Sequence, residues 1–348
     1  MTRQSFARVL GVGPRQLRVL TAVVGALVLA ATVAACGSSS SDQQKTADGL
    51  TPLRLIYDWP GIDFEAVPIV VGQQEGFYKK QGLDVQLILP PDNATTVKML
   101  AVDKGDIGFD TTSDVAFARA ANIPVRSIGN YSQTNNWGLV TPPGKPVDLS
   151  SLTGKSIGVF TDSWTKAMMP YVLKAGHVQD SQVKQVIFQS NDLTPMLAGK
   201  IDIATNTLNY AVAQIQSSTG KKPSTLLASH FGAPDVPIWV YTAMDPWLKT
   251  HGKQAKAFLA ATKQATAWAI AHPQKAVDEF IKAYPNNGSS RKYNLYGWQE
   301  TIACLKGPDG LLTQRPEQWT QLTQALTSVN VLKKAFPAST YYTNKYLP

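Results

Sequence analysis

The chain has 348 residues, with 33 basic and 24 acidic side chains and a formal net charge of +9 at neutral pH. Four arginines precede the first acidic residue, Asp42, so the rest of the chain carries 29 basic against 24 acidic side chains. This excess is small and scattered, which argues against nucleic acid as a partner. Hydrophobic residues make up 44% of the chain, enough for one or two lobes with substantial cores.

The first 35 residues have the pattern of an export signal. A head with four arginines is followed by 17 uncharged residues, 19–35, that end on small side chains. This run is shorter than the ~18 to 20 residues of a spanning helix, so an uncleaved transmembrane anchor is the weaker interpretation. The junction Val33-Ala34-Ala35-Cys36 resembles the lipobox of bacterial lipoprotein signals. The resemblance implies cleavage before Cys36 and a lipid on its thiol.

The residues after this junction predict a tether. Ser, Asp, Gln, Lys, Thr and Gly dominate residues 36–51, which we expect to link a lipid anchor to the folded part. The protein is then held at the cell membrane by its lipid and faces the extracytoplasmic side. Cys304 is the only other cysteine, so no disulfide is expected once Cys36 is lipidated, and a buried apolar role is favoured for its thiol.

Strands and helices alternate along the next part of the chain. Apolar patterns predict strands at 53–57, 85–89, 106–109 and 125–128, and helices at 67–74, at 97–101 with Asn93 as its cap, and at 115–121. The joints between them are short, which predicts an α/β fold with a mostly parallel sheet covered on both faces.

A second unit begins near Pro142, with a strand at 156–160 and a helix from Ser163. The segment from Met99 to Ile107 has a counterpart 97 residues later, from Met196 to Ile203, which predicts two lobes built on one plan. A strand at 238–243 precedes a helical tail that is too short for its own core, so we expect the tail to pack on the first lobe.

Polar and aromatic residues gather in the turns that follow the predicted strands. Ligands of open parallel sheets bind beyond the carboxyl ends of the strands, where helix N-termini present free N–H groups. The alternative is that each Asp, Asn or Ser only caps its own helix. The candidate ligand-binding residues are Asp58, Trp59, Asn93, Thr112, Ser113, Asp162, Ser163, Trp164, Asn191, Asn209 and Tyr210.

Residues 55–140 resemble the SsuA/THI5-like (NMT1-type) solute-binding proteins of ABC importers. The resemblance is carried by Asp58-Trp59-Pro60, by the run from Gln74 to Val85, by Lys104-Gly105-Asp106-Ile107-Gly108 and by Asn122-Ile123-Pro124-Val125. It implies the two-lobed periplasmic-binding-protein fold (type II), with crossings near 129–142 and 232–241. The predicted lobes are 52–138 plus 238–348 and 139–237. It also implies an ABC permease with its ATPase as partners of a monomeric receptor.

Two interpretations of the ligand class remain open. Trp59, Trp164 and Tyr210, with Trp137 and Trp239 as further walls, favour a heteroaromatic solute such as a thiamine-precursor pyrimidine. Pyrimidine-binding relatives carry a His where this chain has Phe64-Glu65-Ala66, and a Glu where Gln214 follows Tyr210, so Glu65 can substitute only if it faces the cleft. A sulfonate, nitrate or taurine-type organic anion is the alternative.

Catalysis is the remaining alternative, because the same family includes a eukaryotic pyrimidine synthase. The chemistry of that synthase resembles chemistry that needs an active-site His and a Cys-rich iron motif. The four His residues of this chain have no metal-ligand spacing. We therefore predict no enzyme activity, no catalytic residue, no metal and no cofactor. A sensor domain that reports its ligand to a membrane partner is a third interpretation.

Overall fold

The computed structural model describes residues 45–188, 190 and 192–348, and these described residues belong to one compact unit. The predicted signal peptide, Cys36 and Asn191 lie outside the described residues. Within the described part, no helix is both long enough and apolar enough to cross a membrane.

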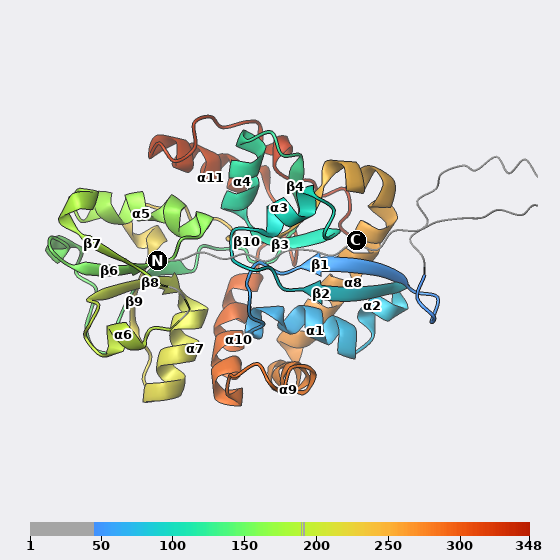
Figure 1. Ribbon diagram of the computed structural model, residues 1–348, viewed down its shortest axis with the longest axis horizontal. Coiled ribbons are helices and arrows are strands. Elements are labelled where there is room, and N and C mark those ends of the chain that lie inside the picture. The colour runs from blue at the N-terminus through green and yellow to red at the C-terminus, as the bar shows by residue number, and fades with distance from the viewer. Residues whose placement is uncertain (1–44, 189, 191) are drawn as a thin grey trace, which may run out of the picture. The chain divides into compact units, whose positions relative to one another are not determined.

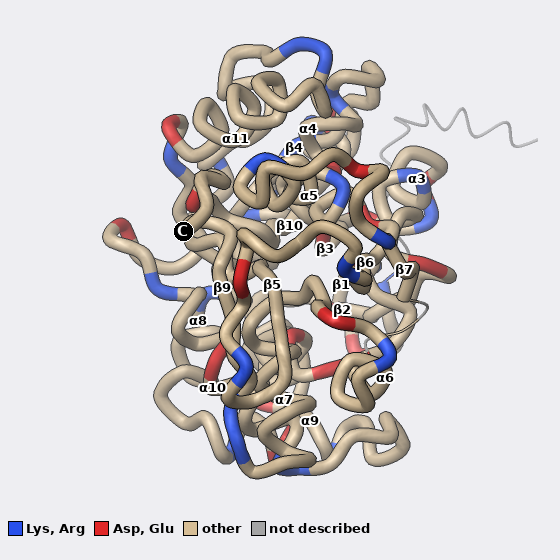
Figure 2. Tube along the Cα trace, turned by 90° about the vertical axis from the view of Figure 1, so that its left-hand side faces the viewer, with Lys and Arg blue, Asp and Glu red and all other residues tan. Residues whose placement is uncertain are grey.

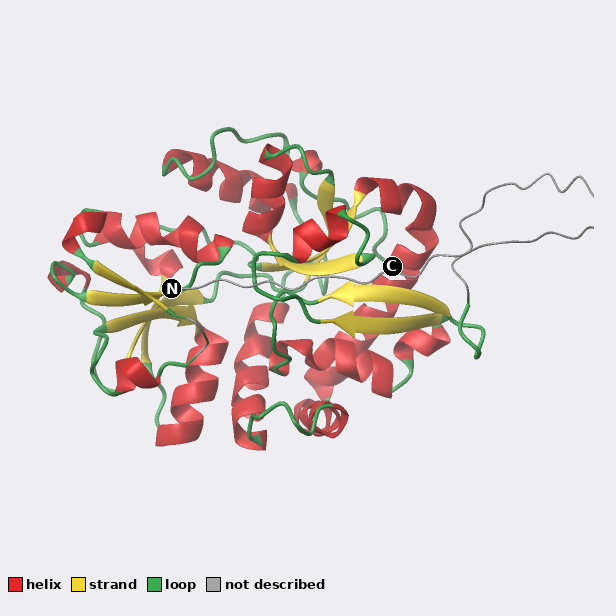
Figure 3. Ribbon diagram, in the orientation of Figure 1, coloured by secondary structure: helices red, strands yellow, loops and turns green. Residues whose placement is uncertain are grey.

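Two five-stranded sheets form the centre of this unit (Figures 1 and 3). The first has the order β2 (Leu83–Ile88), β1 (Thr51–Ile56), β3 (Ile107–Thr111), β10 (Trp239–Met244) and β4 (Val125–Asn130). The second has the order β7 (Lys184–Ile187), β6 (Ser156–Val159), β8 (Ile203–Thr207), β5 (Trp137–Thr141) and β9 (Ser224–Leu227).

Each sheet contains one reversed strand in the fourth place of its order. β10 is antiparallel to β3 and β4, and β5 is antiparallel to β8 and β9, whereas the other pairings are parallel. The chain enters β5 from the first sheet and β10 from the second. These two passages are the predicted crossings, and the mostly parallel α/β architecture is confirmed. β1 begins at Thr51, one residue before the predicted start of the first lobe, and β5 begins at Trp137, two residues before the predicted start of the second lobe. The lobe boundaries themselves stay a prediction.

Helices cover both faces of each sheet. Apolar residues of α1 (Val67–Gln74), α2 (Phe77–Lys80), α8 (Asp245–Ala271), α9 (Pro273–Ala283) and α10 (Arg291–Leu305) share a core with one face of the first sheet, and α3 (Thr96–Ala101) and α4 (Thr112–Ala120) cover the other. On the second sheet, α5 (Ser163–Ala175) covers one face, and α6 (Thr194–Leu197) and α7 (Leu208–Thr219) cover the opposite face (Figure 1).

The helical tail contacts both sheets' helices, not only those of the first. α11 (Pro316–Ser328) places Trp319 and Leu322 in one apolar cluster with Val115 of α4 and Met168 of α5. The hydroxyl of Tyr171 in α5 donates to the carbonyl of Ala325, at 2.9 Å. The apolar face of α11 is therefore shared between α4 and α5, and the assignment of the whole tail to the first lobe stays a prediction.

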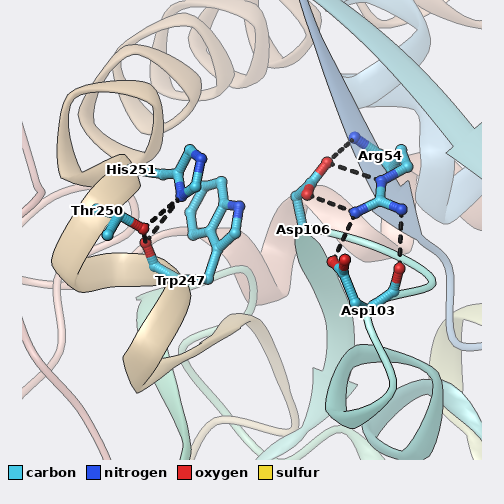
Figure 4. A network of polar contacts seen from close by, with 6 residues as sticks. All are labelled: Arg54, Asp103, Asp106, Trp247, Thr250 and His251. Carbon is cyan, nitrogen blue, oxygen red and sulfur yellow. Dashed lines mark hydrogen bonds and ion pairs between the residues drawn. The ribbon is translucent and has the colours of Figure 1, made fainter. Parts of the chain in front are cut away.

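The predicted repeat has the same hydrogen bond in both halves. Asp106, which precedes β3, accepts from the backbone N–H of Arg54 at 2.7 Å, and Asp202, which precedes β8, accepts from the N–H of Ser156 at 2.8 Å. Asp106 also pairs with the Arg54 guanidinium at 2.9 Å (Figure 4). The two sheets therefore use one plan at the level of single side chains.

One predicted cap is wrong. Asn93 does not cap α3, whose first turn follows Thr95 and has no side-chain cap. The carboxylate of Asp92 instead accepts from the backbone N–H of Ala94 at 2.9 Å and from the Thr95 hydroxyl. This local turn engages the chain before the helix begins, which leaves Asn93 for another role.

Candidate functional site

A cavity lies where the carboxyl ends of the parallel strands of both sheets meet. Its lining residues enclose about 600 Å³ of atom-free space, part of it open to solvent. Eight of its 16 lining residues are aromatic: Tyr57, Trp59, Phe109, Trp137, Phe160, Trp164, Tyr210 and Trp239. The others are Asp58, Glu65, Asn93, Asp162, Thr165, Asn206, Thr207 and Ile238.

Six of the predicted site residues lie in this wall. Asp58 and Trp59 follow β1, Asn93 follows β2, and Asp162 and Trp164 stand at the start of α5 after β6. Tyr210 comes from the first turn of α7, after β8. These residues come together because each follows a parallel strand, and such strands end at the same edge of their sheet.

Four other predicted residues lie outside the wall, and their side chains bond neighbouring elements instead. The hydroxyl of Thr112 donates to the carbonyl of Pro237 at 2.7 Å. The hydroxyls of Ser113 and Ser163 are 2.7 Å apart and join the first turns of α4 and α5. Asn209 donates to Glu65 at 2.7 Å and to Thr301 of α10 at 2.9 Å. Asn191 lies outside the described residues.

From its sequence, Glu65 can replace the acid of pyrimidine-binding relatives only if it faces the cleft. The carboxylate of Glu65 does face the cavity. It lies in the short helix η1 (Phe64–Ala66) and is 3% exposed. Behind it, Asp63 accepts from the hydroxyls of Tyr57, at 2.8 Å, and Tyr210. Gln214 turns away from the cavity, because its amide bonds the Leu193 N–H at 2.9 Å and Asp192 at 3.0 Å.

A group of carboxyls surrounds Asp58. One oxygen each of Asp58, Asp110 and Asp114 lies within 4.8 Å of the others, an arrangement of hard oxygen ligands that suits a cation. Burial raises the pKa of Asp58 and Asp110 well above the usual value, and the neighbouring Asp114 raises both further. Burial also raises the pKa of Glu65, Asp114 and Asp162.

Several buried polar atoms in the wall have no protein partner among the described residues. The indole N–H groups of Trp137, Trp164 and Trp239, the Asn206 amide nitrogen and the Thr207 hydroxyl make no hydrogen bond there. An unpaired buried donor costs ~1–3 kcal/mol, so these groups favour a ligand that carries acceptors. None of the described lining residues is Lys, Arg or His.

Sequence reasoning missed part of the wall as site residues. Phe109 and Phe160 are the last residues of predicted strands and are not among the candidate site residues, although their place at the strand ends was a usable signal. Tyr57, Thr165, Asn206, Thr207 and Ile238 adjoin predicted turns. Trp137 and Trp239, considered only as further walls, do line the cavity.

Comparison with known proteins identifies the family. Residues 63–276 match the model of the family described as NMT1/THI5 like. The chain belongs to this NMT1/THI5-like family.

Proteins similar to this chain are named either for thiamine or pyrimidine biosynthesis or for solute binding. A putative thiamine biosynthesis protein of Haemophilus influenzae is 23% identical over 83% of this chain and 90% of its own. The 4-amino-5-hydroxymethyl-2-methylpyrimidine phosphate synthase of Aspergillus parasiticus is 23% identical over 85% of this chain and 87% of its own. The periplasmic aliphatic sulphonate binding protein SsuA of Escherichia coli superposes with a TM-score of 0.66 at 13% identity, over 85% of this chain and 98% of its own. This similarity confirms the periplasmic-binding-protein fold.

The prediction that the chain is not an enzyme is wrong. Relatives that align with 85% of it are named as a synthase, in Aspergillus parasiticus and in Saccharomyces cerevisiae. The prediction rested on the lack of His and Cys spacing motifs, and such motifs test only some kinds of chemistry.

Proposed function

We propose that this chain is the extracytoplasmic receptor of an ABC importer and that its cavity captures a small heteroaromatic solute such as a thiamine-precursor pyrimidine. The carrying observation is a wall of eight aromatic rings that also offers unpaired N–H donors and carboxylate acceptors. A pyrimidine ring can stack on such rings, and its ring nitrogens and amino group match those donors and acceptors.

The charge of the wall favours this ligand class over the organic anions. Asp58, Glu65 and Asp162 line the cavity, and no basic side chain stands opposite them among the described lining residues. A sulfonate or nitrate would meet three carboxyls and lack the Arg that normally pairs with an anion.

The export pattern supports the proposed location. A lipid on Cys36 would hold the receptor near a permease, and the residues 36–51 would give it reach. Mass spectrometry of the N-terminal peptide from membranes tests this anchor, and an unmodified Cys36 in an uncleaved chain contradicts it.

Ligand binding is tested by calorimetry with 4-amino-5-hydroxymethyl-2-methylpyrimidine, taurine and nitrate. We expect the pyrimidine to bind and the two anions to leave the protein unchanged. Trp164→Ala should weaken pyrimidine binding at least about tenfold, since stacking on a buried ring is worth ~1–3 kcal/mol. Trp247→Ala is the matched control, because Trp247 stacks on His251 outside the cavity wall (Figure 4). Anion binding without pyrimidine binding would refute the proposed ligand class.

A further inference from the structure

The three carboxyls Asp58, Asp110 and Asp114 have no cationic partner in the described part of the chain. The ion pairs there join other residues, and Figure 2 shows basic and acidic positions interspersed along the trace. Asp58 is 4% exposed and Asp110 1% exposed. Asp58 accepts no hydrogen bond there, and one oxygen of Asp110 has no partner.

Every element packed against this group adds further acid or neutral groups. The charges of Asp162, the cap of α5, and of Glu65 in η1 also raise the pKa of Asp58, and β10 supplies the Thr242 hydroxyl, which donates to Asp110. Lys166 of α5 lies 5.9 Å from the Phe117 ring centre and forms no ion pair there. The N-termini of α4 and α5 are already capped by Thr111 with Asp114 and by Asp162. No basic side chain among the described residues therefore balances this group, so a cationic ligand can do so when the carboxyls ionise.

Independent groups point to a ligand in the same cavity. The indole N–H of Trp164, the amide of Asn206 and the hydroxyl of Thr207 belong to side chains that are 2%, 6% and 7% exposed, and they have no partner in the described residues. The wall beside Asp58 includes the rings of Trp59 and Phe109. Aromatic faces attract organic cations, at ~0.5–2 kcal/mol for each well-placed ring, which favours a ring-bearing cation over a hydrated metal ion.

We propose that the ligand of this cavity is an organic cation, a planar ring that carries an ammonium or quaternary nitrogen, with its charge next to Asp58, the member of the carboxyl group that lines the cavity. This inference rests on the proposed function and specifies its ligand further. The positive group neutralises the carboxyls, and the ring accepts hydrogen bonds from the unpaired donors of the wall.

The cluster couples this binding to pH. Because burial raises the pKa of Asp58 and Asp110, the ligand-free protein holds protons on the group where free carboxyls have lost them. A bound cation favours the ionised carboxylates, so binding releases these protons to the buffer. Affinity for a cation therefore rises with pH, whereas affinity for an uncharged ring does not.

The experiment compares three ligands that share one ring. These are 4-amino-2-methylpyrimidine with a 5-aminomethyl group, which is cationic at neutral pH, with a 5-hydroxymethyl group, and with the phosphate ester of that alcohol. The full chain, solubilised in a neutral detergent, is titrated calorimetrically at pH 6 and pH 8 in two buffers of different ionisation enthalpy. We expect the amine to bind at least about tenfold tighter than the alcohol at pH 8, with proton release.

Asp58→Asn removes one carboxylate and keeps the side-chain shape. We expect it to weaken amine binding at least about tenfold, to change alcohol binding little and to reduce proton release. Asp48→Asn is the matched control, because Asp48 is exposed and forms a surface ion pair with Lys79, at 3.5 Å. Thermal unfolding of each variant shows that it is folded.

The outcomes separate this inference from the proposed function. Equal or tighter binding of the alcohol or its phosphate, with Asp58→Asn unchanged, overturns the inference and leaves the heteroaromatic receptor standing. Binding of Mg²⁺, Ca²⁺ or Zn²⁺ that Asp58→Asn abolishes, without amine binding, assigns the group to an inorganic ion and overturns it too. If none of the three ring compounds binds, both the inference and the proposed ligand class fail.

Discussion

At the scale of single residues, Asp58 stands out because it is buried and unpaired in the described part of the chain. Natural proteins usually pair or neutralise a buried charge, and here the neighbours Asp110 and Asp114 are acidic as well. Such a residue weakens the fold, which is expected where a binding group is held ready for a ligand. The stability of the ligand-free protein should therefore report on Asp58 directly.

We predict that Asp58→Asn stabilises the ligand-free protein, by roughly 1–3 kcal/mol at pH 8. The folded pKa of Asp58 is raised by burial, so the folded state keeps a proton that the unfolded chain loses above about pH 4. The free energy of unfolding therefore decreases as the pH rises toward the folded pKa of Asp58. The Asp58→Asn variant does not show this decrease. Urea unfolding between pH 4.5 and 8.5 measures the difference, and a variant that unfolds more easily at pH 8 contradicts it.

At the scale of elements, β5 shows how tightly the second sheet is built. The sequence treats 129–142 as a crossing, yet residues 137–141 form a strand that pairs with β8 and β9. A Cβ on Gly138 would lie 2.2 Å from the carbonyl oxygen of Leu226 and 2.8 Å from the Cα of Leu227. Only glycine allows this close approach of β5 to β9.

Gly138→Ala is therefore expected to destabilise the protein by at least ~1–3 kcal/mol, since the obstructing atoms belong to the backbone and cannot rotate away. Gly61→Ala is a suitable control, because the nearest atoms to its added Cβ belong to the Trp59 ring at 3.8 Å and 4.0 Å. Denaturant unfolding midpoints provide the measurement, and equal midpoints for the two variants would count against this packing.

At the scale of the whole binding unit, hydroxyls connect the two halves of the cavity wall. Ser163 of α5 lies 2.9 Å from the Thr111 hydroxyl and 2.7 Å from the Ser113 hydroxyl, and the Tyr210 hydroxyl of α7 donates to Asp63. In a fold with two crossings, such contacts form when the halves come together around a ligand. Loss of the Ser163 contacts should open the cavity without altering its wall, because Ser163 does not line it.

We expect Ser163→Ala to weaken pyrimidine binding about threefold to tenfold, because each lost hydrogen bond is worth ~0.5–1.5 kcal/mol to the closed arrangement. The radius of gyration of the ligand-free protein should rise in small-angle scattering. Ser328→Ala, which removes only a 2.8 Å bond to the Ala325 carbonyl in α11, is the control. Unchanged affinity and scattering would show that Ser163 has no part in closure.

The sequence by itself determined the α/β class, the alternation of strands and helices, the repeat around Asp106 and Asp202, and six residues of the cavity wall. These features follow from local patterns: apolar periodicity, helix stops and polar turns after strands. The resemblance carried by the run from Gln74 to Val85 also gave the family correctly, although the prediction of no enzyme activity was wrong.

Only the tertiary structure decided which polar residues share a site. Thr112 and Ser113 follow a strand as Asp58 does, yet they bond to Pro237 and Ser163 and lie outside the wall, because the partner that each turn meets comes from a distant part of the chain. For the same reason, the sequence did not predict the cluster of Asp58, Asp110 and Asp114. Asp58 and Asp110 are 52 positions apart and become neighbours only when β1 pairs with β3. Local pattern sets which elements form, whereas long-range pairing sets which charges face one another.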